Sequence, residues 1–342
     1  MTLAWLVLLF AVCTVLIARA GYVLSRSADT LAEAHGWGRN WVGLALLATV
    51  TSLPELASGI SAVAWVDAPD LAVGNALGAC VVNLLFLVVV DALQRRQPMY
   101  RQASATHLLS AGFGVVMLGF VGLSLITGTR APAVLHVGIY SPLLLALYLL
   151  ALKAVHGHER QAMDAAAAAV AQGTGTSGNP IGPQRTRLAW CRFGLAALVV
   201  LVAGSWLPEV ADRLAQALGL SRSFVGTVLM AVVTTLPEMA VTLGALRLGA
   251  LDMAIGNLLG SNLFNVLILS VDDAFYVRGP LLADAAPVHV GTAVTALVMT
   301  GLVIIGLVMR PQGQTLRVVS WISVGLTATY VINAALIYLA GV

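Results

Sequence analysis

Residues 48–59 read ATVTSLPELASG, and residues 231–242 read AVVTTLPEMAVT. Each stretch places a proline and a glutamate inside an otherwise apolar segment. A second motif follows each of them, AVGNALGACVVN from Ala72 and AIGNLLGSNLFN from Ala254. The offset in numbering is 231 − 48 = 183 for the first pair and 254 − 72 = 182 for the second, so one residue is lost between the motifs of the second copy. The chain therefore contains one unit twice.

The composition is that of a protein that spans a membrane several times. Of its 342 residues, 59% are hydrophobic and 10% are charged, whereas soluble domains have about 45 to 50% and about 25%. Windows of about 20 apolar residues, long enough to cross a bilayer, predict ten helices. We expect an all-α polytopic membrane protein with spans near 3–25, 41–66, 70–94, 105–127, 133–155, 189–211, 223–248, 252–274, 287–309 and 318–340.

The duplication predicts how these spans are organised. We assign residues 1–155 to a first five-helix repeat, 156–187 to a cytoplasmic linker and 188–342 to a second repeat. Because five is an odd number, the second repeat enters the membrane from the opposite face, the inverted plan of secondary transporters. An alanine run that could be a short helix, followed by a Gly, Ser and Pro stretch, predicts that the linker is flexible.

Positive charges predict the orientation, because Lys and Arg accumulate in cytoplasmic loops. Ten spans place both termini on one side, and the loops of that side carry four cations: Arg130, Arg213, Arg222 and Arg278. The opposite loops carry thirteen: Arg26, Arg39, Arg95, Arg96, Arg101, Lys153, Arg160, Arg185, Arg187, Arg192, Arg247, Arg310 and Arg317. We therefore expect a plasma membrane or bacterial inner membrane protein with both termini outside.

Some classes of function are disfavoured. The net charge of +3 comes from loop arginines, and no basic run is interleaved with aromatic residues as in a nucleic-acid surface. No pairing of nucleophile and base and no phosphate loop indicates an enzyme. We predict no cofactor and no obligate protein partner, only the lipid bilayer and inorganic cations. Cys13, Cys80 and Cys191 lack disulfide or metal spacing, and we expect them to be buried and inert.

The proline and glutamate of the first motif predict an opened helix with an acid beside the opening. Pro54 removes a backbone donor and clashes with the carbonyl four residues before it, so the helix breaks near Val50. Glu55 follows directly, with Thr51 one turn away on the same face. A carboxylate at this depth is costly and indicates a functional site. The second copy supplies the same groups from Ala231, Thr234, Thr235, Pro237 and Glu238.

The second motif adds amides to the apolar core. Asn83 and Asn265 lie in apolar runs where an amide needs a partner, whereas Asn75 and Asn257 are expected to join helices. Glu209, in the similar stretch SWLPE, lies near a span end without a second motif, and we expect an interfacial residue. We expect solvated or snorkelling carboxylates near span ends at Asp67, Asp70, Asp91, Asp252, Asp272, Asp273 and Asp284.

The candidate site therefore offers only oxygen ligands: carboxylates, hydroxyls, amides and backbone carbonyls. Such a set suits Ca²⁺ or Na⁺ better than Zn²⁺ or Cu⁺. Two carboxylates can neutralise one divalent ion, or protons or monovalent ions taken in exchange. Competition for the same charges is the physical basis of antiport.

At these residues the sequence resembles the calcium/cation antiporter superfamily, and the sodium/calcium exchangers in particular. That family has two inverted repeats of the form G-T-S-L-P-E followed by G-N-x-x-G-S-N-x-x-N/D. The resemblance implies a sodium/calcium exchanger-like fold and Ca²⁺ ligands among Glu55, Glu238, Thr51 and Thr234. It implies a wider ion site comprising Ala48, Thr51, Ser52, Glu55, Asn83, Ala231, Thr234, Thr235, Glu238, Ser261 and Asn265.

Three departures from the family motif bear on the transported ion. Val50 and Val233 replace the usual glycine. Ala79 and Cys80 replace the serine and asparagine of the first G-S-N, so that one hydroxyl is missing. Both final positions are asparagine, which leaves two acids in the site.

The sequence thus predicts an antiporter that exchanges Ca²⁺ for Na⁺, with alternating access by sliding of the first and sixth spans, a movement implied by the family. A Ca²⁺/H⁺ or other monovalent cation exchanger remains open, as does a non-transporting or channel-like relative.

Overall fold

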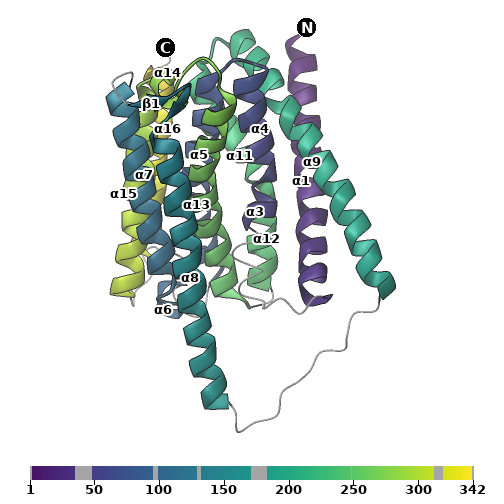
Figure 1. Ribbon diagram of the computed structural model, residues 1–342, viewed down its shortest axis with the longest axis vertical. Coiled ribbons are helices and arrows are strands. Elements are labelled where there is room, and N and C mark those ends of the chain that lie inside the picture. The colour runs from purple at the N-terminus through teal and green to yellow at the C-terminus, as the bar shows by residue number, and fades with distance from the viewer. Residues whose placement is uncertain are drawn as a thin grey trace.

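The structure is a computed structural model that describes residues 2–34, 48–94, 99–128, 132–170, 183–247, 249–311 and 319–340. The long helices run side by side along one axis, and both chain termini lie at the same end (Figure 1). Two short antiparallel strands, β1 (Ala133–Val134) and β2 (Val137–Gly138), form a hairpin at that end.

The described helices follow the duplication. The first repeat contains α1 (Leu3–Ala34), α3 (Ala48–Thr51), α4 (Leu53–Ala64), α5 (Pro69–Leu93), α6 (Met99–Gln102), α7 (His107–Thr127) and α8 (Tyr140–Val170). The second contains α9 (Pro183–Leu218), α10 (Arg222–Phe224), the π-helix η3 (Val225–Met230), α11 (Ala231–Thr234), α12 (Leu236–Arg247), α13 (Leu251–Phe275), α14 (Leu281–Asp284), α15 (Val288–Met309) and α16 (Trp321–Ala340).

The predicted all-helical membrane fold is confirmed. Within the described residues, seven helices are long and apolar enough to cross a bilayer, and the pair Arg222–Thr234 and Leu236–Arg247, bent by 41°, makes an eighth. Shorter apolar helices, Leu53–Ala64 and Tyr140–Val155, lie in the two remaining predicted spans. Part of the second predicted span, 41–47, lies outside the described residues.

The predicted linker is more helical than expected. Helix α8 continues through the alanine run to Val170, and α9 begins at Pro183. The expected boundaries at 155 and 188 therefore fall inside these helices. Alanine has the highest helix propensity of all residues, so the run extends the fifth span instead of interrupting it. Residues 171–182 of the predicted linker lie outside the described part of the chain.

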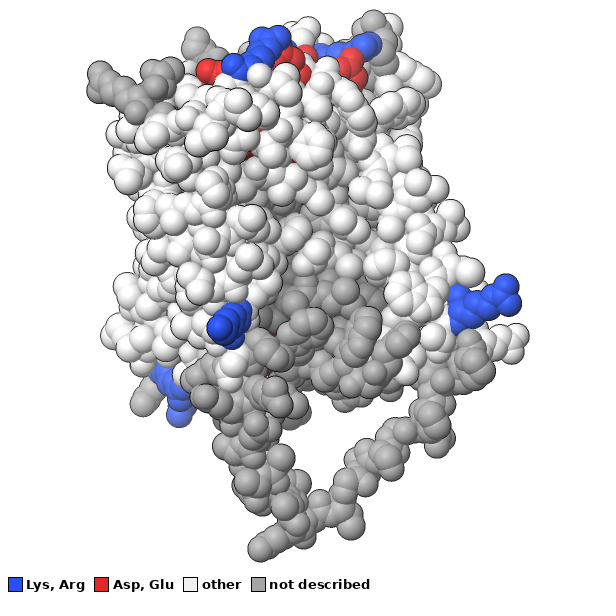
Figure 2. All heavy atoms as spheres, in the orientation of Figure 1, with Lys and Arg blue, Asp and Glu red and all other residues white. Residues whose placement is uncertain are grey.

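The surface has the pattern of a protein embedded in lipid. Figure 2 shows acidic and basic side chains at one end of the molecule and basic side chains toward the other, with a largely uncharged surface between them. Large apolar side chains cover this surface, among them Val15 of α1 and Leu195 of α9, which are 60% and 66% exposed. Cys191, also on α9, is exposed. The expectation that all three cysteines are buried is therefore wrong for Cys191, although it is confirmed for Cys13 and Cys80.

Helices α5 and α13 form the centre of the bundle. Their most apolar windows are 67% and 89% buried, against 22% and 28% for α1 and α9, which pack against each other at one side. Gly74 and Gly78 of α5 lie against Thr227 of η3 without room for a larger side chain. As the sequence predicted, these glycines let helices approach closely.

The two outer helices meet the broken helices of the opposite repeat. A Cβ atom on Gly21 of α1 would lie 2.6 Å from Cβ of Pro237, and one on Gly204 of α9 would lie 3.2 Å from the carbonyl oxygen of Pro54. The two glycines are separated by the repeat offset of the first motif (204 − 21 = 183), as are the two prolines (237 − 54 = 183). The two contacts are therefore equivalent under the duplication.

Three acids predicted to be solvated are instead buried. Asp91, Asp272 and Asp273 are at most 1% exposed. Asp91 accepts hydrogen bonds from the Ser320 N–H and the Ser323 hydroxyl, both at 2.7 Å, and from the Met99 N–H at 3.4 Å.

Asp273 accepts the equivalent bonds in the other repeat. Its donors are the N–H groups of Gly138 and Leu281, at 2.8 and 2.7 Å, and the hydroxyls of Ser141 and Tyr140, at 2.5 and 2.6 Å. The first three donors are each the repeat counterpart of a donor to Asp91, at the offset of the second motif (320 − 138, 323 − 141 and 281 − 99 all equal 182). Sequence position near a span end suggested water as the partner, whereas the folded chain supplies amides and hydroxyls.

A second pair of acids joins the repeats to each other. Asp70 of α5 accepts from the Ala286 N–H at 2.7 Å and pairs with Nε2 of His289 at 3.1 Å. Asp252 of α13 accepts from the Ser104 N–H at 2.7 Å and pairs with His107 at 3.0 Å. Every member is the repeat counterpart of another at the same offset (252 − 70, 286 − 104 and 289 − 107 all equal 182). As expected, Asp70 and Asp252 stay partly exposed, with 26% and 57% of their side chains accessible.

Candidate functional site

Both Leu-Pro-Glu motifs interrupt their helices. The first helix stops at Ser52, between α3 and α4, where φ is −87° and ψ is 12°. The second stops at Thr235, between α11 and α12, with φ of −80° and ψ of 1°. Pro54 and Pro237 are the second residues of the helices that restart, positions where a missing N–H is harmless. The predicted breaks are therefore present in both repeats.

Glu238 is held by hydroxyls from both repeats. Its side chain is fully buried, and Oε1 accepts a hydrogen bond from Ser52 at 2.8 Å and a longer one from Ser261 at 3.5 Å. Its other oxygen, Oε2, has no hydrogen-bond partner among the described residues. Ser52 belongs to the break of the first repeat, so this bond ties the two motifs together.

Glu55 is also fully buried but has no such support. Neither of its carboxylate oxygens has a hydrogen-bond partner within the described part of the chain. Thr235, the counterpart of Ser52, donates instead to the Ala231 carbonyl at 2.8 Å. Ala79 stands at the position equivalent to Ser261 (261 − 182) and has no hydroxyl. Glu55 and Glu238 are near enough to repel each other electrostatically.

The asparagines of the second motif divide into two groups. Asn75 donates to the Ser58 hydroxyl at 2.9 Å and accepts from Thr234 at 3.1 Å. Asn257 donates to the Thr242 hydroxyl and to the Glu238 carbonyl, both at 3.2 Å. Both amides join neighbouring helices, as the sequence predicted.

Asn83 and Asn265 keep buried oxygens without partners. Asn83 donates to Oδ1 of Asn262 at 3.1 Å, while its own Oδ1 has no partner among the described residues. Neither side-chain polar atom of Asn265 has one. Asn265 lies one helical turn after Ser261 on the same face of α13. Both amide oxygens are therefore available to a cation.

Asn262 is a contact residue that the sequence reasoning did not assign. Its amide donates to the Cys80 carbonyl at 3.2 Å, and the Cys80 thiol donates to the Asn262 carbonyl at 3.7 Å. The two residues are repeat counterparts (262 − 80 = 182), so α5 and α13 meet at equivalent positions. Asn262 is the asparagine of the second G-S-N motif, but only the folded structure shows that it joins the two repeats.

The structure brings most of the predicted site residues into the buried centre of the molecule. Ala48 begins α3, and its side chain is outside the described part. The others are at most 1% exposed: Thr51, Ser52, Glu55, Asn83, Ala231, Thr234, Thr235, Glu238, Ser261 and Asn265. Among the described residues no group of three His, Cys, Asp or Glu side chains could hold a metal. The donor set is thus oxygen from two acids, hydroxyls and amides, which suits hard cations.

The similar stretch SWLPE, which contains Glu209, does not belong to this site. Glu209 is about half exposed and pairs with Arg213 at 2.6 Å, one turn along α9. It therefore lies at the surface, in agreement with the expected interfacial position.

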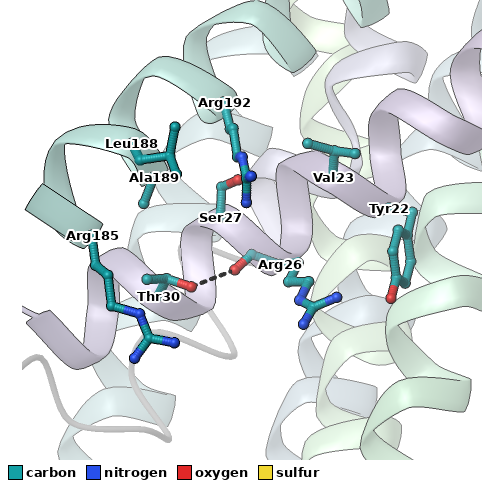
Figure 3. A pocket seen from close by; sticks show the side chains of 9 residues that line it. All are labelled: Tyr22, Val23, Arg26, Ser27, Thr30, Arg185, Leu188, Ala189 and Arg192. Atoms are coloured by element: carbon teal, nitrogen blue, oxygen red, sulfur yellow. Dashed lines mark hydrogen bonds between the residues drawn. The ribbon is translucent and has the colours of Figure 1, made fainter. Parts of the chain in front are cut away.

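A basic cavity of about 490 Å³ lies between α1 and α9. Figure 3 shows Arg26, Arg185 and Arg192 around it, together with Ser27 and Thr30. Neither Glu55 nor Glu238 lines this cavity. It is therefore separate from the carboxylate site.

A known family matches both halves of the chain. The family described as sodium/calcium exchanger protein matches residues 5–153 and 188–339. CaxA of Alkalimonas amylolytica is 31% identical over 250 residues, which is 72% of this chain and 72% of that protein. The chain belongs to the sodium/calcium exchanger family and is a membrane cation antiporter, not an enzyme.

Two further relatives and a solved structure agree with this placement. Inner membrane protein YrbG of Escherichia coli is 28% identical over 237 residues, 67% of this chain and 66% of YrbG. The sodium/calcium exchanger MaX1 of Methanosarcina acetivorans is 37% identical over 83 residues, 24% of each chain. A structure of the sodium-calcium exchanger NCX_Mj, soaked with Na⁺ and Sr²⁺, matches 96% of this chain and 97% of its own with a TM-score of 0.63 and 20% identity. This last likeness concerns the fold.

Proposed function

We propose that the protein exchanges Ca²⁺ for Na⁺ at a site between Glu55 and Glu238. One observation carries the proposal: two buried carboxylates, one from each repeat, lie beside the broken helices and close enough to repel each other, and three of their four oxygens have no partner among the described residues. A buried charge without partners is strongly destabilising. A cation of opposite charge would supply the missing partner, and Ca²⁺ prefers this kind of oxygen set.

The hydroxyls and amides around the two acids complete the proposed ligand set. Thr51, Ser52, Thr234, Thr235 and Ser261 offer hydroxyl oxygens. Asn83 and Asn265 offer amide oxygens, and Ala48 and Ala231 offer backbone carbonyls beside the breaks. Ca²⁺ takes six to eight oxygen ligands, a number that this set can supply. The same acids can neutralise one Ca²⁺ or two Na⁺, so that the ions compete.

We infer that α1 and α9 move together during alternating access. They are among the least buried of the long helices, and they pack on each other. Gly21 and Gly204 let them lie close to the two broken helices, with no side chain of their own at the contact. A sliding pair of this kind would expose the site first to one side of the membrane and then to the other.

We also propose that the chain lies in a bacterial inner membrane with both termini outside. The excess of arginine in the loops at the opposite end supports this orientation. The resemblance to an inner membrane protein of Escherichia coli supports the location.

The test is ⁴⁵Ca²⁺ uptake into proteoliposomes loaded with Na⁺. Glu55→Gln should abolish uptake, because an amide carries no charge to balance Ca²⁺. Glu209→Gln, which neutralises a surface acid, is the matched control and should retain the wild-type rate. Normal uptake in Glu55→Gln would contradict the assignment.

A second candidate, Ca²⁺/H⁺ exchange, is favoured by one feature of the site. Glu55 has no hydrogen-bond donor among the described residues, and Asn83 and Asn265 add no charge. A carboxyl group in such surroundings readily takes a proton. Uptake driven by an imposed pH gradient in the absence of Na⁺ and K⁺ would favour this candidate, whereas uptake driven only by Na⁺ would exclude it.

A further inference from the structure

Two adjacent acids at the end of α13 have opposite surroundings. Asp272 and Asp273 are both fully buried. Asp273 accepts four hydrogen bonds, two from backbone amides and two from hydroxyls. Neither carboxylate oxygen of Asp272 has a partner among the described residues. Asp272 therefore lies beside an acid that four donors hold in place, and it lacks such donors itself in the described part of the chain.

The duplication separates the roles of the two acids. Asp273 corresponds to Asp91 (273 − 182), which is anchored by equivalent donors in the first repeat. Asp272 corresponds to Val90, which is buried and apolar. The fold of this segment therefore does not require a carboxylate at position 272.

The Asp272 carboxylate lies over the helix that carries Glu55. A Cβ atom on Gly59 of α4 would lie 2.5 Å from Oδ1 of Asp272, so the carboxylate occupies the space that a side chain there would fill. Gly59 is four residues after Glu55 and on the same face of α4. In the second repeat this position is Thr242 (59 + 183), whose hydroxyl accepts from Asn257. The space beside Gly59 and the carboxylate that fills it are therefore present in the first of the two broken helices only.

This position lies between the central site and the end of the molecule that holds the chain termini. Both α4 and α13 run toward that end (Figure 1). Asp272 lies about one turn of α4, roughly 5 Å, beyond Glu55 in that direction. A cation that reaches Glu55 from this end along the shared face of α4 would pass the Asp272 carboxylate.

No described cation is paired with Asp272. Its titratable neighbours are acids and phenols, together with His136, whose Nε2 lies 3.1 Å from the Ala274 carbonyl oxygen. Asp273 is adjacent on α13, and Glu55 is one turn away on α4. From α8, the Tyr140 hydroxyl is bonded to Asp273. At the outer rim, Asp67 pairs with Arg278. Tyr276 donates to Asp284 at 2.9 Å, and burial together with that acid raises the pKa of Tyr276 to about 12.

We propose that Asp272 is a proton-binding site on the outer branch of the ion pathway, where a passing cation displaces the proton. The inference rests on the proposed exchange function. A buried carboxylate without donors must hold a proton or a cation. When a cation arrives, the carboxyl O–H bond breaks and the proton leaves to the outer solution. When the cation moves on to Glu55 and Glu238, a proton from the same side binds again.

The test is ⁴⁵Ca²⁺ uptake from the outer side at a series of outer pH values. In the wild type, the rate should rise about tenfold from acidic to alkaline pH, because an ionised Asp272 attracts the cation. Asp272→Asn should stay at the low rate throughout. Gly59→Ala, which displaces the carboxylate and keeps its charge, should also flatten the profile. Asp284→Asn removes an exposed acid at the same end and should keep the wild-type profile.

A second measurement separates this inference from the proposed function. Na⁺ is added to the purified protein in weakly buffered detergent solution, and released protons are read with an indicator dye. At Na⁺ concentrations that keep the outer branch occupied after the central site is filled, the wild type should release more protons than Asp272→Asn. Equal release, or an unchanged pH profile in Asp272→Asn, would overturn the role of Asp272. Absence of Ca²⁺ uptake in the wild type would contradict the exchange function, while proton release would still test Asp272.

Discussion

The two repeats use the same acids in the same way at their ends, whereas at their centre they differ. Asp91 and Asp273 accept equivalent hydrogen bonds at opposite ends of the bundle, and so do Asp70 and Asp252. At the centre, Glu238 has hydroxyl donors, and Glu55 has none among the described residues. The acids at the ends hold the two inverted repeats in the same arrangement, so their hydrogen bonds are alike in both repeats. The centre is the proposed ion site, where two unlike carboxylates would distribute charge unequally.

The largest expected effect tests the matched ends. Asp91→Ala and Asp273→Ala should each lower the free energy of unfolding by about 3 to 5 kcal/mol, because buried amides and hydroxyls lose a charged acceptor. Thermal unfolding in detergent measures the loss. The loss should be greater for Asp273→Ala, since Asp273 has an additional bond from Tyr140. If one of the two substitutions left the free energy of unfolding unchanged, the two ends would not be equivalent.

A smaller effect tests the unmatched centre. Ala79→Ser supplies the hydroxyl that Ser261 provides in the other repeat, so it should give Glu55 a donor. The added hydroxyl oxygen can also serve as a further ligand for Ca²⁺, and we expect Ca²⁺ to bind about tenfold more tightly by calorimetry, which is about 1.4 kcal/mol. Cys80→Ser changes the neighbouring side chain and serves as the control. Unchanged affinity in Ala79→Ser would show that the missing serine does not explain the asymmetry.

The smallest effect concerns the links between repeats. His107→Gln and His289→Gln should each lower the free energy of unfolding by about 1 kcal/mol, because glutamine retains one donor for the partly exposed acid. The two losses should be equal, and both can be read from the unfolding temperature. A large loss for one variant alone would mean that the Asp70 and Asp252 links are not equivalent.

Sequence patterns predicted the features that depend on local chemistry. Proline opened the helices where expected, and the duplicated motifs marked Glu55 and Glu238 because an acid is conspicuous in an apolar run. The burial of Asp91, Asp272 and Asp273 was not predictable. The donors to Asp91 and Asp273 include residues up to 232 positions away, and several are backbone amides, which leave no mark in the sequence. That Asp272 meets no donor in the described part of the chain can be seen only after folding.

The extension of helices into the predicted linker could not be predicted, for a different reason. Gly, Ser and Pro residues indicated a flexible segment, but the preceding alanine run could form a separate helix or extend the fifth span. The structure shows the extension, to Val170. Helix propensity is a local property, whereas the register that joins two helical stretches depends on the residues between them.

The direct measurement is the position of a heavy divalent ion in crystals soaked with Sr²⁺, located by its anomalous scattering. We predict a peak between the carboxyl groups of Glu55 and Glu238, within coordination distance of both, which disappears in Glu55→Gln. A peak bound by only one of the two glutamates, or one that survives the substitution, would contradict a cation site shared by the two repeats.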